Sequence, residues 1–270
     1  NWDDKELIKN MIRIQNHRGP DDNGYFNDRY VTIGNNRLSI IDLSAAGHQP
    51  ISNKDSTCWI VFNGEIYNFM EIRKGLEKKG YKFRSNTDTE VIVNAYTEYG
   101  EDCLKLFNGD FAFCIYDSTK RKLFLARDRM GVKPLYYYFK NNKFIFASEI
   151  KTILQYKEIT PELDYYSLNH YMTFRYNFTE RTLFKDIYKL LPGQKIIFDL
   201  KSNKLNISRY WDMFTLETIN DNEEVISKNL EDLFAKSVKR RLISDVPLGA
   251  YLSGGIDSSA IVGMMRKVQG

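Results

Sequence analysis

The chain has 270 residues, of which 43% are apolar and 27% charged, as in a folded protein of one large or two ordinary domains. Its net charge of +4 arises from 39 Lys and Arg against 35 Asp and Glu, and this even balance gives no reason to expect nucleic acid as a partner. The apolar runs are strand-sized and the first residues are acidic, so we expect neither a membrane span nor a signal peptide. Three scattered cysteines without metal-type spacing favour a reducing, cytoplasmic location.

The spacing of apolar residues predicts an α+β unit over residues 1–215. Its helices are expected at 6–16, 71–79 and 88–99, and Thr87 and Glu90 stand at capping-box spacing before the last of these. Residues 17–24 read as a loop because they contain glycine and proline. Its short strands are expected at 30–34, 37–42, 58–62, 111–116, 122–126, 135–139, 144–147 and 194–200.

A second unit is expected over residues 216–270, because the composition becomes polar and acidic near residue 215. A long amphipathic helix over 226–242, with Asp221 and Glu224 at capping spacing, precedes a strand-like run at 246–252 and a further helix. This order is typical of the start of an α/β domain. One strand cannot form a parallel sheet, so we expect an incomplete domain whose 226–242 helix exposes its apolar face.

The turn between that strand and the last helix reads Ser253-Gly254-Gly255-Ile256-Asp257-Ser258-Ser259. A glycine-rich turn before a helix presents N–H groups at the positive helix end and suits phosphate or pyrophosphate. The lysine-bearing loop of common nucleotide triphosphatases is absent, and the pattern instead resembles the pyrophosphate loop of enzymes that split ATP into AMP and pyrophosphate. The alternative is a Ser/Gly turn that binds nothing.

Arg37, Asn63, Gly64, Glu65 and Asp88 fall at the ends of predicted elements, where loops gather functional groups. Together they suit a free α-amino acid: a guanidinium can clamp the carboxylate, and two carboxylates can hold the ammonium group. The Asn63 side chain and the Gly64 N–H can stabilise an oxyanion. Each residue also has an ordinary interpretation, as a turn, a helix cap or a solvated arginine, and spacing alone leaves both open.

Six runs, in this order, resemble glutamine-hydrolysing asparagine synthetase: residues 17–21, 37–42, 63–68, 126–136, 147–151 and 245–249, followed by the glycine-rich turn. The resemblance implies an N-terminal-nucleophile hydrolase αββα sandwich acting as glutaminase. The start of an α/β ATP-pyrophosphatase domain would follow it. It also implies glutamine, aspartate and ATP as substrates, asparagine formation through a β-aspartyl-AMP intermediate, and a homodimer as the assembly.

The same resemblance assigns the site residues. Asn63 and Gly64 form the oxyanion hole, and Asp257 is the residue expected to help place Mg²⁺. His17 and Arg18 resemble scaffold around the pocket. The glutamine pocket comprises Arg37, Leu38, Ser39, Ile40, Ile41, Asn63, Gly64, Glu65 and Asp88. The ATP-binding residues are Leu252, Ser253, Gly254, Gly255, Asp257, Ser258 and Ser259.

The chain departs from this family at its start, because the family nucleophile is a cysteine at the mature N-terminus and this chain begins with Asn1. Cys58, Cys103 and Cys114 are not terminal, and we expect none of them to lie near the glutamine motifs. We therefore expect the nucleophile and first strand to be missing and the numbered chain to be inactive. Three alternatives remain: an amidotransferase with another acceptor in a polysaccharide or antibiotic pathway, a β-lactam-synthetase-like enzyme with an inactive first domain, and a non-catalytic glutamine sensor.

Overall fold

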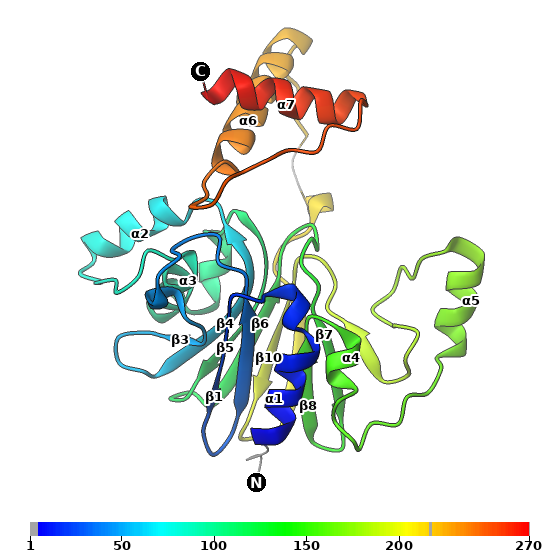
Figure 1. Ribbon diagram of the computed structural model, residues 1–270. Helices are drawn as coiled ribbons and strands as arrows, with labels where there is room; N and C mark the ends of the chain where they lie inside the picture. The colour runs from blue at the N-terminus through cyan, green and yellow to red at the C-terminus, as the bar shows by residue number, and fades with distance from the viewer. Residues whose placement is uncertain (1–4, 216–217, 270) are drawn as a thin grey trace.

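The computed structural model describes residues 5–215 and 218–269, and Figure 1 shows a layered body of sheets and helices with a pair of helices above it. The predicted boundary at 215–216 borders residues 216–217, which lie outside the described residues. The helices are α1 Lys5–Ile14, α2 Phe69–Lys78, α3 Asp88–Tyr99, α4 Ile150–Ile153, α5 Tyr165–Phe174, α6 Glu223–Arg240 and α7 Ile256–Gln269. The strands are β1 Asp22–Asn27, β2 Thr32–Arg37, β3 Ile51–Ser52, β4 Cys58–Ile66, β5 Gly109–Asp117, β6 Lys122–Arg127, β7 Tyr136–Lys140, β8 Lys143–Ala147, β9 Ile187–Lys189, β10 Gln194–Asp199 and β11 Lys204–Arg209.

The strands form three antiparallel sheets. The largest has six strands in the order β11-β10-β6-β5-β4-β3, and the others are β8-β7-β9 and β1-β2. Helices α2 and α3 cover one face of the six-stranded sheet, whose other face packs on the smaller sheets, as where Phe198 stacks on Phe144 with ring centroids 4.7 Å apart. Helices α1 and α4 cover the far side of the smaller sheets. This order of layers confirms the predicted αββα sandwich.

Strand β5 shows why the central strands read as continuous apolar runs. Phe111, Phe113 and Ile115 belong to the core that packs against α2 and α3. The alternate residues Ala112 and Cys114 belong to the core between the sheets. A strand with period-two side chains must be apolar at every position when both faces are covered. The same double coverage applies to β4, which carries the candidate residues of the first unit at its end.

The expected strand at 37–42 is wrong: β2 ends at Arg37, and residues 38–42 form a loop. The guanidinium of Arg37 reaches past this loop, and its Nη2 donates to the carbonyl oxygens of Ile41 and Asp42. Asp42 adopts φ +59°, which a continuing strand does not allow. The apolar pattern of 38–41 therefore reflects a loop whose polar groups are satisfied by a buried arginine.

The expected strand at 246–252 is also wrong, because no residue there pairs with a strand among the described residues. A buried parallel strand needs neighbours on both sides, and residues 218–269 supply only α6 and α7. Helix α6 is capped by Asn222, whose side chain accepts from the N–H of Val225, rather than by Asp221. Six of the described helices and strands were missed: β1, which begins inside the predicted loop at 17–24, together with β3, β9, β11, α4 and α5.

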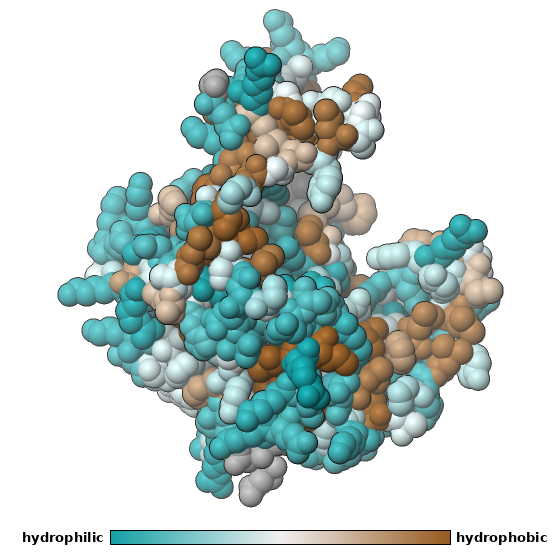
Figure 2. Space-filling view, in the orientation of Figure 1, coloured by the Kyte–Doolittle hydropathy of each residue, from teal (hydrophilic) through white to brown (hydrophobic). Residues whose placement is uncertain are grey.

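Helices α6 and α7 contact one another but leave much of their apolar surface exposed, as expected for the first of them. Leu230 and Leu233 of α6 are 65% and 61% exposed, whereas Val238 near its end is buried. Figure 2 shows apolar side chains gathered on this helical pair and along the arm that bears α5. Within the described residues, the structure contains no helix long and apolar enough to cross a membrane.

Helix α3 begins at a buried cap. The hydroxyl of Thr87 accepts from the N–H of Glu90 at 3.2 Å, as the capping-box spacing predicted. The Glu90 carboxylate instead reaches further back and accepts from the N–H groups of Arg84 and Ser85. The cap therefore fixes both the helix and the loop that precedes it, which lies against the candidate site.

We expect Thr87→Ala to lower the free energy of unfolding by about 1–2 kcal/mol, because it removes the N-cap acceptor of a buried helix end. Urea unfolding followed by circular dichroism measures the change. Thr119→Ala, at an exposed position in the β5–β6 turn, is the matched control and should change stability by less than about 0.5 kcal/mol. Equal stabilities of the two variants would contradict the role given to Thr87.

Candidate active site

A cavity of about 390 Å³ lies between β2, β8 and the face of β4 and β5 that points away from α2 and α3. Three polar side chains that line it, Asn36, Asn63 and Thr152, each hold a buried nitrogen or oxygen with no hydrogen-bond partner among the described residues. Leaving such an atom unpaired costs about 1–3 kcal/mol. These atoms therefore mark a place where a ligand or a further chain segment would complete the structure.

Asn63 and Gly64 follow the buried part of β4, next to β5. Gly64 has φ +149°, and a Cβ atom there would lie 2.1 Å from the carbonyl oxygen of Asp110 on β5. Only glycine permits that close approach of the two strands. The alternative interpretation of Asn63-Gly64 as a turn is therefore wrong, because both residues lie within β4. Their assignment to an oxyanion hole stays a prediction, with the unpaired Nδ2 of Asn63 available as a donor.

Glu65 and Asp88 form an acidic pair at the end of β4. Asp88 is the first residue of α3, and its carboxylate accepts from the N–H of Ile66 at 2.9 Å, which ties the helix to the strand. Burial, together with the charge of Asp88, raises the pKa of Glu65 to about 7. Burial also raises the pKa of Asp88 to about 6, against its hydrogen bond from Ile66. One Glu65 oxygen has no partner among the described residues, so a cationic group fits beside this pair.

Arg37 is buried, and the structure uses its guanidinium to hold the loop that follows β2. Nη1 donates to the carbonyl of Ser44 at 3.3 Å, in addition to the two bonds from Nη2 to Ile41 and Asp42. A Cβ atom on Gly47 would lie 2.0 Å from Nη2, so the loop closes over the guanidinium. The contact of Arg37 with a substrate carboxylate stays a prediction, and its observed contacts are with the main chain.

The remaining members of the predicted pocket lie in this loop. Leu38 is exposed, and Ser39 is fixed by a bond from its N–H to the Asp21 carboxylate at 2.8 Å. The carbonyl of Ile40 accepts from the N–H of Asp245, more than two hundred residues further along the chain. The loop over 38–41 is therefore held from both ends and from the second unit, as a ligand-binding loop of fixed shape requires.

His17 and Arg18 both contact Glu149, at 2.9 and 3.1 Å. Although partial burial opposes the change, hydrogen bonds from Lys151, His17 and Arg18 lower the pKa of Glu149 to about 2. This ion-pair cluster joins the segment after α1 to the segment before α4, at the rim of the cavity that Arg18 lines. The scaffold role of both residues stays a prediction, and these contacts support it.

All three cysteines are free and buried. Cys114 lines the cavity and pairs across the sheet with Val61, two residues before Asn63, so the expectation that no cysteine lies near the glutamine motifs is wrong. Burial raises the pKa of the Cys114 thiol well above its usual range, and it raises that of Cys58 to about 11. A thiol without a nearby base in an apolar strand is a poor nucleophile.

The glycine-rich turn precedes α7, and Gly254 has φ +81°. Ser253 and Ser258 close the turn, with their hydroxyl oxygens 2.9 Å apart. The turn and Asp257 in the first helical turn are exposed. The described residues hold no group of three His, Cys, Asp or Glu side chains that could bind a metal ion, and the role of Asp257 in placing Mg²⁺ stays a prediction.

Sequence reasoning missed several residues that shape this region. Asp42 accepts a hydrogen bond from the N–H of Asn86, and Asp110 on β5 pairs with Glu65 across the sheet. Asn36 and Thr152 add unpaired polar atoms to the cavity. Asp42 lies inside the 37–42 motif, but nothing in the local pattern indicates its long-range contacts. Asp245 belongs to the 245–249 motif, and its sequence gives no sign that it contacts the glutamine loop directly.

Comparison with known families defines the class of this protein. Residues 1–211 match the glutamine amidotransferase domain family, and residues 229–270 match the asparagine synthase family. The chain therefore belongs to the glutamine amidotransferase domain family, followed by the beginning of an asparagine synthase domain. Among solved structures, the glutamine phosphoribosylpyrophosphate amidotransferase of Bacillus subtilis has the same fold, with TM-score 0.55 and 15% identity over 97% of this chain and 62% of that chain.

Particular relatives are more similar in sequence. The putative glutamine-hydrolysing asparagine synthetase 2 of Methanocaldococcus jannaschii is 40% identical, over 97% of this chain and 54% of its own length. Glutamine-hydrolysing asparagine synthetase 1 of Bacillus subtilis is also 40% identical, over 98% of this chain and 41% of its own. The amidase chry2 of Gibberella zeae is 35% identical, over 98% of this chain and 40% of its own length. The chain therefore spans between 40% and 54% of the length of these relatives.

The acidic pair predicts a pH dependence of stability. Because the folded-state pKa of Glu65 is raised from 4.5 to about 7, the folded chain binds a proton that the unfolded chain releases between these values. This contribution is fully present below pH 4.5 and is lost as the pH rises through 7. We expect Glu65→Gln to reduce the fall in melting temperature between pH 5 and 8.

Differential scanning calorimetry across that range measures the effect, with Glu158→Gln at an exposed position as the control. The control should follow the unmodified chain. A Glu65→Gln profile parallel to that of the control would show that Glu65 titrates normally in the folded state.

Proposed function

We propose that the first unit binds glutamine and, in the full-length gene product, releases ammonia from it. The observation that carries this proposal is the acidic pair Glu65 and Asp88 beside the unpaired amide of Asn63. Two carboxylates with raised pKa values, Asp88 buried and Glu65 half-buried, favour a cationic ligand such as an α-ammonium group. The Nδ2 of Asn63 would then donate to the oxyanion that forms at the side-chain amide of the same substrate.

The nucleophile of this proposal is an N-terminal cysteine on a strand that fills the cavity. Strand β2 pairs only with β1, and β8 only with β7, among the described residues. Residues of both strands line the same cavity, so each presents an edge to it. An inserted strand would join the two smaller sheets and bring its end toward Asn63. The α-amino group of such a cysteine would act as the general base for its own thiol.

The second unit, on this proposal, is the beginning of a synthetase domain that uses ATP and Mg²⁺. Leu252 and the turn over 253–259 would hold the pyrophosphate at the N-terminus of α7, and Asp257 would place the metal. ATP would adenylate the side-chain carboxylate of aspartate with loss of pyrophosphate. Ammonia from the first unit would then displace AMP and give asparagine. The similarity to named asparagine synthetases supports aspartate as the acceptor.

A related enzyme with another carboxylate acceptor is the second candidate. The similarity to the amidase chry2 favours it, because that relative matches the chain over almost the same span as the synthetases do. Both candidates share the glutamine site and differ only in the acceptor. An experiment on the acceptor therefore separates them without testing the first unit.

In the full-length gene product, Asn63→Ala should lower kcat for ammonia release from glutamine about 10²–10³-fold, because it removes one oxyanion donor. The KM for glutamine should change much less, since the donor acts mainly in the transition state. A coupled glutamate assay measures both constants. Asn206→Ala, at an exposed position on β11, is the control and should retain normal constants. A variant at position 63 with undiminished kcat would remove Asn63 from the mechanism.

Aspartate labelled with ¹⁸O in its side-chain carboxylate should transfer one labelled oxygen to AMP when the full-length gene product turns over with ATP and ammonia. The transfer follows because the carboxylate oxygen attacks the α-phosphate and stays with AMP when ammonia displaces it. Mass spectrometry of AMP detects the label. Pyrophosphate release that does not depend on aspartate would favour the second candidate.

A further inference from the structure

The segment that joins α6 to the glycine-rich turn packs against the amidotransferase unit. Arg240 forms an ion pair with Glu71 of α2 at 3.1 Å. The guanidinium of Arg241 lies over the ring of Tyr67, 4.4 Å from its centroid. Ile243 packs against the apolar core formed by α2, α3 and the six-stranded sheet. Figure 1 shows this connection descending from the helical pair onto the body of the molecule.

Asp245 ends this run of contacts and touches the predicted glutamine loop at two points. Its N–H donates to the carbonyl of Ile40 at 2.9 Å. Its carboxylate Oδ2 accepts from the N–H of Asp42 at 2.7 Å. The two bonds bracket Ile41, so the main chain of the loop is held on either side of that residue. One of these bonds depends on the side chain and is open to mutation.

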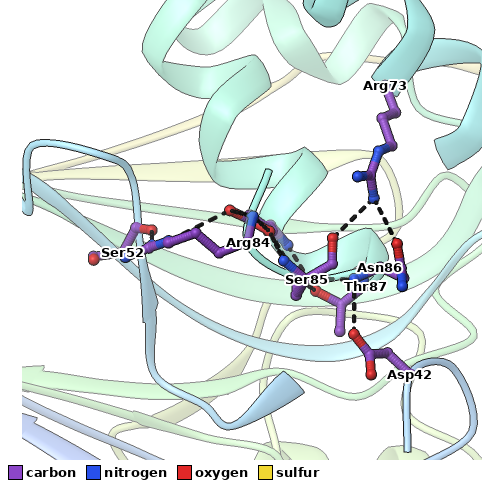
Figure 3. A network of polar contacts seen from close by, with 8 residues as sticks. Asp42, Ser52, Arg73, Arg84, Ser85, Asn86 and Thr87 are labelled. Carbon is purple, nitrogen blue, oxygen red and sulfur yellow. Dashed lines mark hydrogen bonds and ion pairs between the residues drawn. The ribbon is translucent and has the colours of Figure 1, made fainter. Parts of the chain in front are cut away.

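Asp42 links the loop after β2 to the loop that precedes Asp88 of the acidic pair. One oxygen of its carboxylate accepts from the N–H of Asn86 at 2.7 Å, and the other accepts from Ser44. Asn86 lies two residues before Asp88, in the loop that Arg73 also holds (Figure 3). A non-glycine residue at φ +59° is disfavoured unless its surroundings fix it. The loop therefore depends on hydrogen bonds such as the one to Asp245.

We propose that Asp245 is a positioning residue for the glutamine pocket and acts through its hydrogen bond to the N–H of Asp42. This inference rests on the proposed function of the first unit. The contact places one residue of the synthetase unit, eight positions before Ser253, in direct control of the loop that lies between Arg37 and Asp42. The shape of the glutamine site then depends on the docked position of the second unit.

The test compares Asp245→Ala with Asp245→Asn in the full-length gene product. The alanine variant loses the acceptor for the Asp42 N–H, whereas the asparagine variant keeps a carbonyl oxygen at the same place. We expect Asp245→Ala to weaken glutamine binding about tenfold, at the lower end of the effect of losing a hydrogen bond to a charged group. Asp245→Asn should restore most of the affinity. Isothermal titration calorimetry measures the dissociation constants.

Two further readouts separate positioning from general damage. Hydrogen exchange of the Asp42 amide should quicken in Asp245→Ala and stay slow in Asp245→Asn, while amides of β5 stay protected in both. The KM for glutamine should rise more than kcat falls. Asp221→Ala, at an exposed position before α6, is the matched control and should bind glutamine normally.

The outcomes distinguish this inference from the proposed function. If the unmodified protein does not bind glutamine, that result contradicts both the proposed function and this inference. If the unmodified protein binds glutamine and Asp245→Ala binds it equally well, the inference alone is overturned. Equal weakening in the alanine and asparagine variants also overturns it, because the hydrogen bond to Asp42 would then not be the cause.

Discussion

The geometry of the candidate site depends on the hydrogen bonds that Asp42 makes. Its carboxylate accepts from Ser44 within its own loop and from Asn86 ahead of α3, while its N–H donates to Asp245. Its carbonyl also accepts from Arg37. One residue thus connects the end of β2, the start of α3 and the second unit. The hydrogen bond from Ser44 is the largest favourable effect on its carboxylate, whose pKa is lowered despite the cost of burial.

The carboxylates of Glu65 and Asp88 repel one another when both are ionised, and a cationic ligand would reduce this repulsion. A folded chain normally avoids placing two carboxylates together under partial burial, because each then resists ionisation. Here Glu65 and Asp88 are held together by the strand and helix that carry them, and Asp110 on β5 adds a further like charge to Glu65. The cations that act on Glu65, Lys133 and Arg241, offset this only in part. Binding sites commonly retain such strain in the free state.

Sequence reasoning predicted the layers well because they follow from periodicity. Helix α3 was expected at the residues where it lies, and β5 was visible because both its faces are apolar. The loop after β2 could not be predicted in this way, since Leu38, Ile40 and Ile41 give an apolar run whether or not they pair. Its conformation depends on a buried arginine and on contacts with residues far along the chain. The prediction of a strand at 246–252 was wrong for a related reason, because a strand forms only where a neighbouring strand pairs with it.

The candidate site residues also divide into those that the sequence alone indicates and those that only three-dimensional contacts identify. Asn63, Gly64 and Glu65 could be found because their types match the chemistry of an amino-acid site at the end of a predicted strand. Asp245 could not be assigned a role from its own motif, because its significance arises only when the second unit docks on the first. A residue that positions a loop through a main-chain N–H needs only an acceptor in the right place. Such residues carry no chemical signature in the sequence, and the three-dimensional contacts are what identify them.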